Sequence, residues 1–156
     1  QPQSFTVVTG DIVEHFYINE NREVFVNGRN ITTITQTVTP VYGGITPFAD
    51  DDEWTFAMEV TLTYDLSGLS PIGVSNLLTK LGFSALTSTI LDMSADLIIG
   101  EVFQNGVYLE DVQRTYYKNI HQSRPDMKIE HSFYLVAEVL GEVVLDEYIG
   151  DLTIYG

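Results

Sequence analysis

The strongest constraint on the fold is an alternation of apolar and polar side chains over residues 54–66. Every even position is apolar or aromatic, whereas the odd positions carry mainly threonine and carboxylates. Successive side chains of a β-strand point to opposite faces, so this period of two predicts one long strand with a buried face. The residues expected on the buried face are those at the even positions: Trp54, Phe56, Met58, Val60, Leu62, Tyr64 and Leu66.

A second alternation, over residues 129–139, predicts another long strand. It places His131 on the same side as Phe133 and Leu135. We expect His131 to be a hydrogen-bonded core residue rather than a metal ligand. His15 and His121 lie far from it in the sequence, and no HExxH motif occurs, so a zinc site is not expected.

Several short polar segments predict tight turns. Asn27-Gly28 predicts a hairpin that pairs residues 22–27 with 30–39, and Asn105-Gly106 predicts one that pairs 97–104 with 107–117. Residues 19–21, Asn-Glu-Asn, are expected to turn the strand over 12–18 back towards Val24.

Only residues 75–91 have helical periodicity, and Gly82 is expected to divide them into two short pieces. This helical insert is expected to close one end of a sandwich. The chain is therefore predicted to be all-β, one domain over residues 1–156, with a β-sandwich of jelly-roll or Greek-key type and one short helical insert near 75–91.

Charge excludes several partners. The chain has 7 Lys and Arg against 22 Asp and Glu, a net charge of −15, which repels nucleic acids and anionic lipids. No apolar run approaches the roughly 20 residues of a membrane helix. The absence of cysteine excludes disulfides and thiolate sites. The Gln1-Pro2 start and the sequon at Asn30 favour a processed, secreted protein that can carry a glycan.

The sharpest local feature is four consecutive carboxylates, Asp50, Asp51, Asp52 and Glu53. Carboxylate and carbonyl oxygens suit Ca²⁺, so the segment is a candidate calcium site, although it lacks the EF-hand pattern. A solvated acidic loop is the alternative interpretation. Two smaller acidic pairs are candidate second sites, or half-sites that another subunit completes: Asp146-Glu147 and Glu110-Asp111.

The N-terminal segment is a candidate assembly strand. It is short, apolar on alternate positions and free of charge. Such a strand can add to the open edge of a neighbouring sheet, and repeated donation produces a ring or a filament. An ordinary first strand of the chain's own sheet is an equally good interpretation. The assembly strand comprises Ser4, Phe5, Thr6, Val7, Val8 and Thr9.

No catalytic motif is present: the sequence contains no G-x-S-x-G elbow and no Walker or G-x-G-x-x-G loop. A glycosidase needs only two carboxylates at a suitable separation, for which Glu59 is a candidate. We nevertheless expect the protein not to be an enzyme.

The processed start QPQSFTVVTGD, the acidic, cysteine-free, β-rich chain and the DDDE loop together resemble the subunits of archaeal extracellular cannulae. More loosely, they resemble other donor-strand filament subunits of cell surfaces. The resemblance implies a jelly-roll subunit that polymerises outside the cell into tubes, with its N-terminal strand in a neighbour and Ca²⁺ at subunit contacts. Ser4 to Thr9 and Asp50 to Glu53 are the residues to which these roles transfer.

The sequence thus predicts an extracellular structural protein that assembles with identical subunits by strand exchange, promoted by divalent cations. Two alternatives stay open at this point. One is a calcium-dependent carbohydrate-binding module that uses Trp54 or tyrosines as stacking platforms. The other is a viral capsid or decoration protein.

Overall fold

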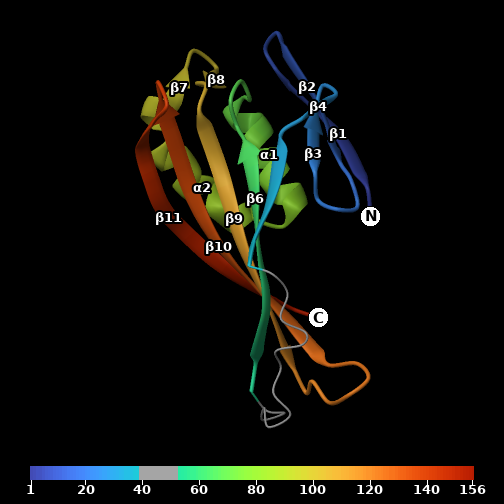
Figure 1. The fold of residues 1–156 in the computed structure, drawn as a ribbon. Coiled ribbons are helices and arrows are strands. Elements are labelled where there is room, and N and C mark those ends of the chain that lie inside the picture. The colour runs from blue at the N-terminus through green and yellow to red at the C-terminus, as the bar shows by residue number, and fades with distance from the viewer. Residues whose placement is uncertain (39–52) are drawn as a thin grey trace.

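The computed structural model describes residues 1–38 and 53–156. This part of the chain is mostly β, with 56% strand and 17% helix, and its sheets are antiparallel. The strands form a four-stranded N-terminal sheet, a five-stranded sheet and a two-stranded sheet. A helical segment accompanies them (Figure 1). The prediction of a β-rich chain with a short helical insert is therefore confirmed.

The N-terminal sheet is a meander of β1 (Gln3–Thr9), β2 (Ile12–Ile18), β3 (Val24–Val26) and β4 (Arg29–Asn30). The predicted turn over 19–21 joins β2 to β3. Asn27 (φ +49°) and Gly28 (φ +81°) form the predicted two-residue turn between β3 and β4. Both backbone conformations are left-handed, which explains why Asn and Gly occupy these positions.

The prediction that residues 30–39 continue this hairpin is wrong. The chain leaves the N-terminal sheet at Ile31, whose N–H donates to Val24 O and whose carbonyl accepts from Asp65 N–H. β5 (Thr32–Val38) then pairs with β6 (Thr55–Asp65) in the other sheet. Threonine-rich sequence favours a strand but does not select its partner.

The five-stranded sheet has the order β11-β10-β9-β6-β5. β9 (Val107–Lys118), β10 (Asp126–Val139) and β11 (Glu142–Tyr155) are its long strands. β10 contains the predicted alternation over 129–139, and His131, Phe133 and Leu135 are buried as expected.

The hairpin predicted at Asn105-Gly106 is wrong. β8 (Val102–Phe103) pairs with β7 (Ile98–Ile99), whereas β9 lies between β6 and β10. Gly106 instead allows its backbone to lie close to that of Glu138, because a Cβ at position 106 would lie only 2.4 Å from the Glu138 carbonyl oxygen. The Glu138 N–H donates to Gly106 O at 2.8 Å.

A β-bulge corrects the predicted face of the 54–66 strand. Phe56 lies opposite Tyr116 and Met58 opposite Thr115, so Ala57 is an extra residue in β6. One extra residue reverses the alternation of side chains. Phe56 therefore lies on the same face of the sheet as Tyr116, and buried Leu62 lies on the other face. Trp54 is half-buried rather than in the core.

The helical segment consists of α1 (Pro71–Leu81), a 3-10 turn over Ser84–Leu86, α2 (Thr87–Met93) and a second 3-10 turn over Ala95–Leu97. The predicted break is confirmed, since Gly82 ends α1 with φ +88°. α1 starts earlier than predicted because Ser70 caps it and Pro71 fits its first turn.

The helices lie against one face of the five-stranded sheet and do not close an end, which corrects the expected position (Figure 1). We call this the inner face. Apolar residues of the helices, the N-terminal sheet and the inner face form one core. Its largest fully buried side chains are Tyr64, Phe16, Phe103, Phe133, Leu66, Leu77, Leu78 and Ile90.

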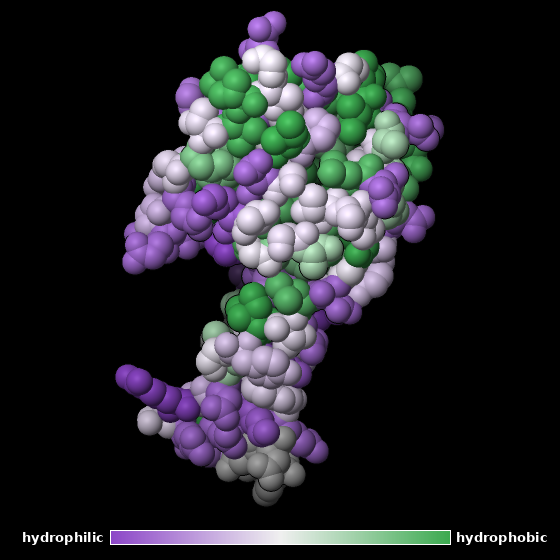
Figure 2. Space-filling view, turned by 180° about the vertical axis from the view of Figure 1, so that it is seen from behind, coloured by the Kyte–Doolittle hydropathy of each residue, from purple (hydrophilic) through white to green (hydrophobic). Residues whose placement is uncertain are grey.

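Below the helices the ends of β6, β9 and β10 continue as a narrow arm (Figure 1). The view from behind shows hydrophobic side chains gathered on the broad upper body, and a mainly hydrophilic lower end (Figure 2). None of the helices in the described part of the chain has the length and hydropathy needed to span a bilayer.

Candidate functional site

The edge strand β11 offers a long unpaired backbone. Its 14 residues pair with β10 on one side, and among the described residues no backbone hydrogen bond joins its other side. Gly156 exchanges both backbone hydrogen bonds with Met127. In an antiparallel ladder the bonded positions alternate, so Tyr155, Thr153 and Asp151 direct their N–H and C=O groups to the open edge.

From Gly150 to Tyr155 this edge carries few of the features that prevent strands from pairing, and Asp151 is its one charged side chain. β11 contains no Lys, Arg or Pro, and its register to β10 runs without a shift from Gly150 to Tyr155. Two bulges interrupt the earlier part of the strand. Tyr155 is 69% exposed and Ile154 48%. A long, exposed edge of this kind is a template for a strand from another chain.

The predicted assembly strand, Ser4 to Thr9, lies in β1, which forms the edge of the N-terminal sheet. It is paired with β2 of its own chain. The Phe5 and Phe16 rings stack at 4.8 Å, and Val7 is buried. The structure thus places the segment as a first strand of its own sheet, the interpretation that the sequence left open, with one edge free.

The free edge of β1 can be assigned residue by residue. The backbone of His15 on β2 bonds to Asn27, because the Asn27 N–H donates to His15 O and the His15 N–H donates to Asn27 Oδ1, each at 2.9 Å. Thr6, which lies opposite His15, therefore directs its N–H and C=O outward. Alternation gives Ser4 and Val8 the same direction.

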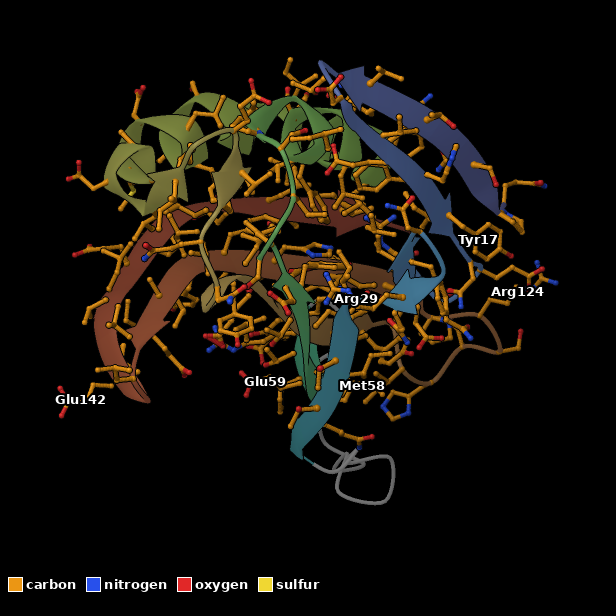
Figure 3. The ribbon with its side chains drawn as sticks, turned by 90° about the horizontal axis from the view of Figure 1, so that it is seen from above. Tyr17, Arg29, Met58, Glu59, Arg124 and Glu142 are labelled. Atoms are coloured by element: carbon orange, nitrogen blue, oxygen red, sulfur yellow. The ribbon has the colours of Figure 1, made fainter. Side chains whose placement is uncertain are left out.

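β4 and β5 are the other end strands of these two sheets. The β1 and β11 edges lie on opposite sides of the molecule (Figure 1). β1 runs upward in that view and β11 downward. A copy displaced sideways without rotation would therefore meet its neighbour with the two strands antiparallel. Seen from above, Glu142 at the start of β11 and Tyr17 on β2 are at opposite sides (Figure 3).

The outer face of the five-stranded sheet, opposite the helices, carries hydroxyl and carboxylate side chains. Thr63, Tyr108, Glu110, Val136 and Glu138 line a shallow depression there. Partial burial, with the nearby Asp146 charge, raises the pKa of the Glu110 carboxyl. The depression presents hydrogen-bond acceptors and one aromatic ring.

The described residues of the predicted acidic sites do not form a cation site. Asp50, Asp51 and Asp52 lie outside the described residues, and Glu53 is exposed. In the register of β10 with β11, Asp146 lies opposite Val136 and Glu147 lies opposite Leu135. These neighbours in β11 point to opposite faces of the sheet, so they do not converge on one ion.

Glu110 and Asp111 are separated in the same way, since Glu110 is on the outer face and Asp111 is buried. Residues 1–38 and 53–156 contain no group of three His, Asp or Glu side chains placed to hold a metal ion.

Asn30, the predicted glycosylation residue, is exposed on β4. Its Oδ1 accepts from Thr32 N–H at 2.8 Å, and its Nδ2 donates to Glu23 Oε2 at 3.3 Å. Thr32 Oγ1 accepts from Val24 N–H. The sequon therefore takes part in the crossing between the two sheets.

The expectation for His131 is confirmed. Its Nδ1 lies 2.8 Å from Asp111 Oδ1, and Gln113 Nε2 donates to Asp111 Oδ2 at 2.8 Å. Nearby, burial raises the pKa of the Tyr64 hydroxyl above its usual range. Glu59, the candidate glycosidase residue, bonds Arg114 Nε at 2.7 Å on the outer face.

Sequence reasoning missed a buried carboxylate, Glu14. Its Oε2 accepts from Ser70 N–H at 3.0 Å, and its Oε1 accepts from the Ser70 hydroxyl at 2.6 Å. The Ser70 Oγ in turn accepts from Gly73 N–H at 2.9 Å. Glu14 thus joins β2 to the first turn of α1. The Ser70-Pro71 start signal predicts the cap but not its distant partner.

Comparison of the chain with protein-family models, with curated proteins and with solved structures gave no significant match.

Proposed function

We propose that this protein is a non-enzymatic structural subunit that assembles head to tail with identical copies. The observation that carries the proposal is the position of two edge strands, β1 and β11. Each has backbone groups without a partner strand on its outer side, and the two lie on opposite sides of one molecule. A contact between two different surfaces of the same chain leaves one of each free on every open assembly, so growth continues as a filament or a tube unless the assembly closes into a ring. In this arrangement the assembly is extracellular, as the archaeal cannula resemblance implies.

Backbone hydrogen bonds supply the affinity. The segment Gly150–Tyr155 offers a regular edge, and the seven residues of β1 offer a matching length. β1 carries no charged side chain, which lets it approach the acidic β11 without direct repulsion. In edge addition of this type, side chains on alternate positions select the partner.

Divalent cations promote assembly by offsetting the repulsion between subunits of charge −15. β11 contributes Glu142, Asp146, Glu147 and Asp151 to the repelling surface. Asp50, Asp51, Asp52 and Glu53 remain the proposed Ca²⁺ ligands, with Asp146 and Glu147 as half-sites that two subunits complete.

Two finer points belong to the same proposal. A complete β-sandwich of jelly-roll or Greek-key type is the proposed description of the assembled subunit. Exchange of β1 into a neighbouring chain is the alternative to edge addition, but it would separate Phe5 from Phe16 and expose Val7. Those contacts favour edge addition.

Proline at Thr6 or Thr153 tests the proposal. Each change removes one outward N–H and leaves the ladder inside the subunit intact. Electron microscopy and sedimentation velocity with and without millimolar CaCl₂ should show polymers of the wild type and monomers of both proline variants. Thr6→Ala and Thr153→Ala are matched controls that keep the N–H and should polymerise. Polymers from the proline variants, with melting curves unchanged, would reject edge pairing.

A calcium-dependent carbohydrate-binding module is the second proposal. It is favoured by the outer-face depression, where Tyr108 lies beside Thr63 and two carboxylates. Glycan-array binding that chelator abolishes and Tyr108→Ala removes would support it. A viral capsid or decoration protein would use the same edges, and closed shells in the microscope, instead of open filaments, would identify it.

A further inference from the structure

Asn30, Phe25, Tyr17 and Ser4 form one row across the N-terminal sheet. Phe25 lies directly opposite Asn30 in the register of β3 with β4, and Tyr17 lies directly opposite Phe25 in the register of β2 with β3. Ser4 lies opposite Tyr17 on β1. Residues directly opposite each other in antiparallel strands project from the same face of the sheet. The sequon asparagine therefore shares a face with two aromatic residues, and we call these four residues the aromatic row.

The aromatic row lies on the face of the N-terminal sheet that is turned away from the core. The neighbouring positions along the strands, Phe5, Phe16 and Val26, belong to the other face. Phe16 and Val26 are buried, and Phe5 packs against the core. Tyr17 is instead 41% exposed, and Asn30 is exposed. The aromatic row is thus accessible to a ligand.

A shallow depression of about 430 Å³ covers three residues of the row. Ser4, Thr6, His15, Tyr17 and Phe25 line it with hydroxyl, imidazole and aromatic groups, and its lining contains no carboxylate in a chain that has 22. The rings of Tyr17 and Phe25 are 6.0 Å apart and inclined by 44°. An uncharged surface of hydroxyl groups and aromatic rings suits a neutral ligand that is rich in hydroxyl groups.

The chemistry of this lining matches a carbohydrate. The C–H groups on one side of a pyranose ring carry a slight positive charge, and they stack on the negative face of an aromatic ring. Thr6 Oγ1 lies 3.0 Å from His15 Nδ1, which leaves His15 Nε2 for a hydrogen bond with a sugar hydroxyl. A neutral sugar also escapes the repulsion that an anion meets on a chain of charge −15.

The Asn30 amide retains its hydrogen bonds when a sugar is attached. Its Nδ2 donates to Glu23 Oε2 at 3.3 Å, and its Oδ1 accepts from Thr32 N–H at 2.8 Å. N-glycosylation replaces only one of the two Nδ2 hydrogens, so both bonds can persist. In this transfer the bond between Nδ2 and sugar C1 forms and the bond between C1 and the phosphate of a lipid-linked oligosaccharide breaks. The phosphate leaves with the bonding electrons, and one Nδ2 proton is released.

The position of Asn30 at a sheet edge gives the sugar a second effect. β4 is an end strand of the N-terminal sheet. The Ile31 N–H donates to Val24 O, so by alternation Asn30 directs its own backbone N–H and C=O to the open side of β4. Native proteins commonly cover exposed edges of this kind. A glycan at Asn30 shields the β4 edge and leaves β1 as the open edge of this sheet.

We propose that Asn30 carries an N-linked glycan whose first two sugars lie across Phe25 and Tyr17 of the same chain. Neighbouring strands are about 4.8 Å apart, so β4 and β2 are separated by roughly 10 Å, a distance that two linked pyranose rings can span. Attachment to the chain keeps the sugars at high local concentration, so weak stacking contacts suffice to hold them. This inference does not depend on the pairing of β1 with β11.

Mass spectrometry tests the attachment in the chain isolated from the cells that make it. Asn30 belongs to the single N-x-Ser/Thr sequon of the sequence, so one glycosylated peptide is expected. That peptide should carry the mass of an oligosaccharide, and release of the glycan by an amidase should convert residue 30 to aspartate. A predominantly unmodified Asn30 would overturn the proposal.

NMR spectroscopy tests where the glycan lies, in samples kept monomeric without CaCl₂. Nuclear Overhauser effects should connect the ring protons of Phe25 with the first sugar and those of Tyr17 with the second. A glycan that is attached to Asn30 but shows no contact with either ring would overturn the packing on the aromatic row.

Thermal unfolding measures the effect of the packing on stability. The chain with its intact glycan should melt about 2–4 °C higher than the same chain trimmed to the first sugar, because only the longer glycan reaches Tyr17. Tyr17→Ser should abolish this difference between the two glycan forms. Tyr148→Ser, which removes a 53% exposed tyrosine from β11, is the matched control and should preserve it. A difference that persists in Tyr17→Ser would contradict the proposed contact.

Discussion

The two faces of the five-stranded sheet give neighbouring carboxylates different environments, one buried and one on the surface. Asp111 lies on the inner face, fully buried, and bonds His131 and Gln113. Glu110, the preceding residue, lies on the outer face among Thr63, Tyr108 and Glu138. The difference shows that strand register decides whether an acidic residue is structural or available to a partner. The largest effect of substitution should therefore occur on the inner face.

Asp111→Ala should give the largest effect. It removes the partner of both Gln113 and buried His131, and losses of this type cost about 3–5 kcal/mol of unfolding free energy. Urea denaturation followed by circular dichroism measures the change. Glu110→Ala, one residue away on the outer face, is the control and should stay within about 0.5 kcal/mol. Equal losses for the two variants would abolish the distinction between the faces.

Glu14→Ala should have the next largest effect. The Ser70 N–H and hydroxyl lose their buried acceptor at the start of α1, which costs about 1–3 kcal/mol. The same denaturation experiment measures it, and exposed Glu20→Ala is the matched control. A loss no greater than that of the control would mean that Glu14 does not hold β2 to the helix.

Glu59→Gln tests an ion pair on the outer face. The side chains of Arg114 and Glu59 are 44% and 19% exposed, so solvent screens their interaction. We expect a loss of about 0.2–1 kcal/mol that shrinks at high salt. A loss of unfolding free energy as large as that of Asp111→Ala would show that solvent does not screen this ion pair on the outer face.

The smallest effect should be the pH dependence of Glu110. Burial raises the pKa of this carboxyl in the folded protein, so the folded state binds protons more tightly than the unfolded state. The contribution to stability is complete below the ordinary pKa and is lost as pH rises through the raised value. Glu110→Gln should therefore melt slightly higher than wild type at pH 7, with the difference reduced at pH 4. A difference that grows in acid would contradict this sign.

Some of the fold followed from local pattern. The alternation over 129–139 correctly predicts β10 and buried His131, and Gly82 correctly predicts the end of α1. Asn27-Gly28 correctly predicts a turn. These features depend on residues close in sequence, where propensity and periodicity operate.

Predictions that needed a distant partner were less successful. The bulge at Ala57 reversed the faces of Trp54 and Phe56, and the Asn105-Gly106 hairpin did not form because β9 pairs with β6 and β10 instead. The candidate site divides in the same way. The sequence identified the N-terminal strand, but the free edge of β11 is not visible without the fold.

The sequence by itself determined that this chain is acidic, without cysteine and rich in long strands, because composition and period-two alternation are local properties. The tertiary structure decided which strands are edges and which carboxylates are buried. An edge is defined by the absence of a neighbour, and burial by residues distant in the chain, so neither can be read from the pattern around a single residue.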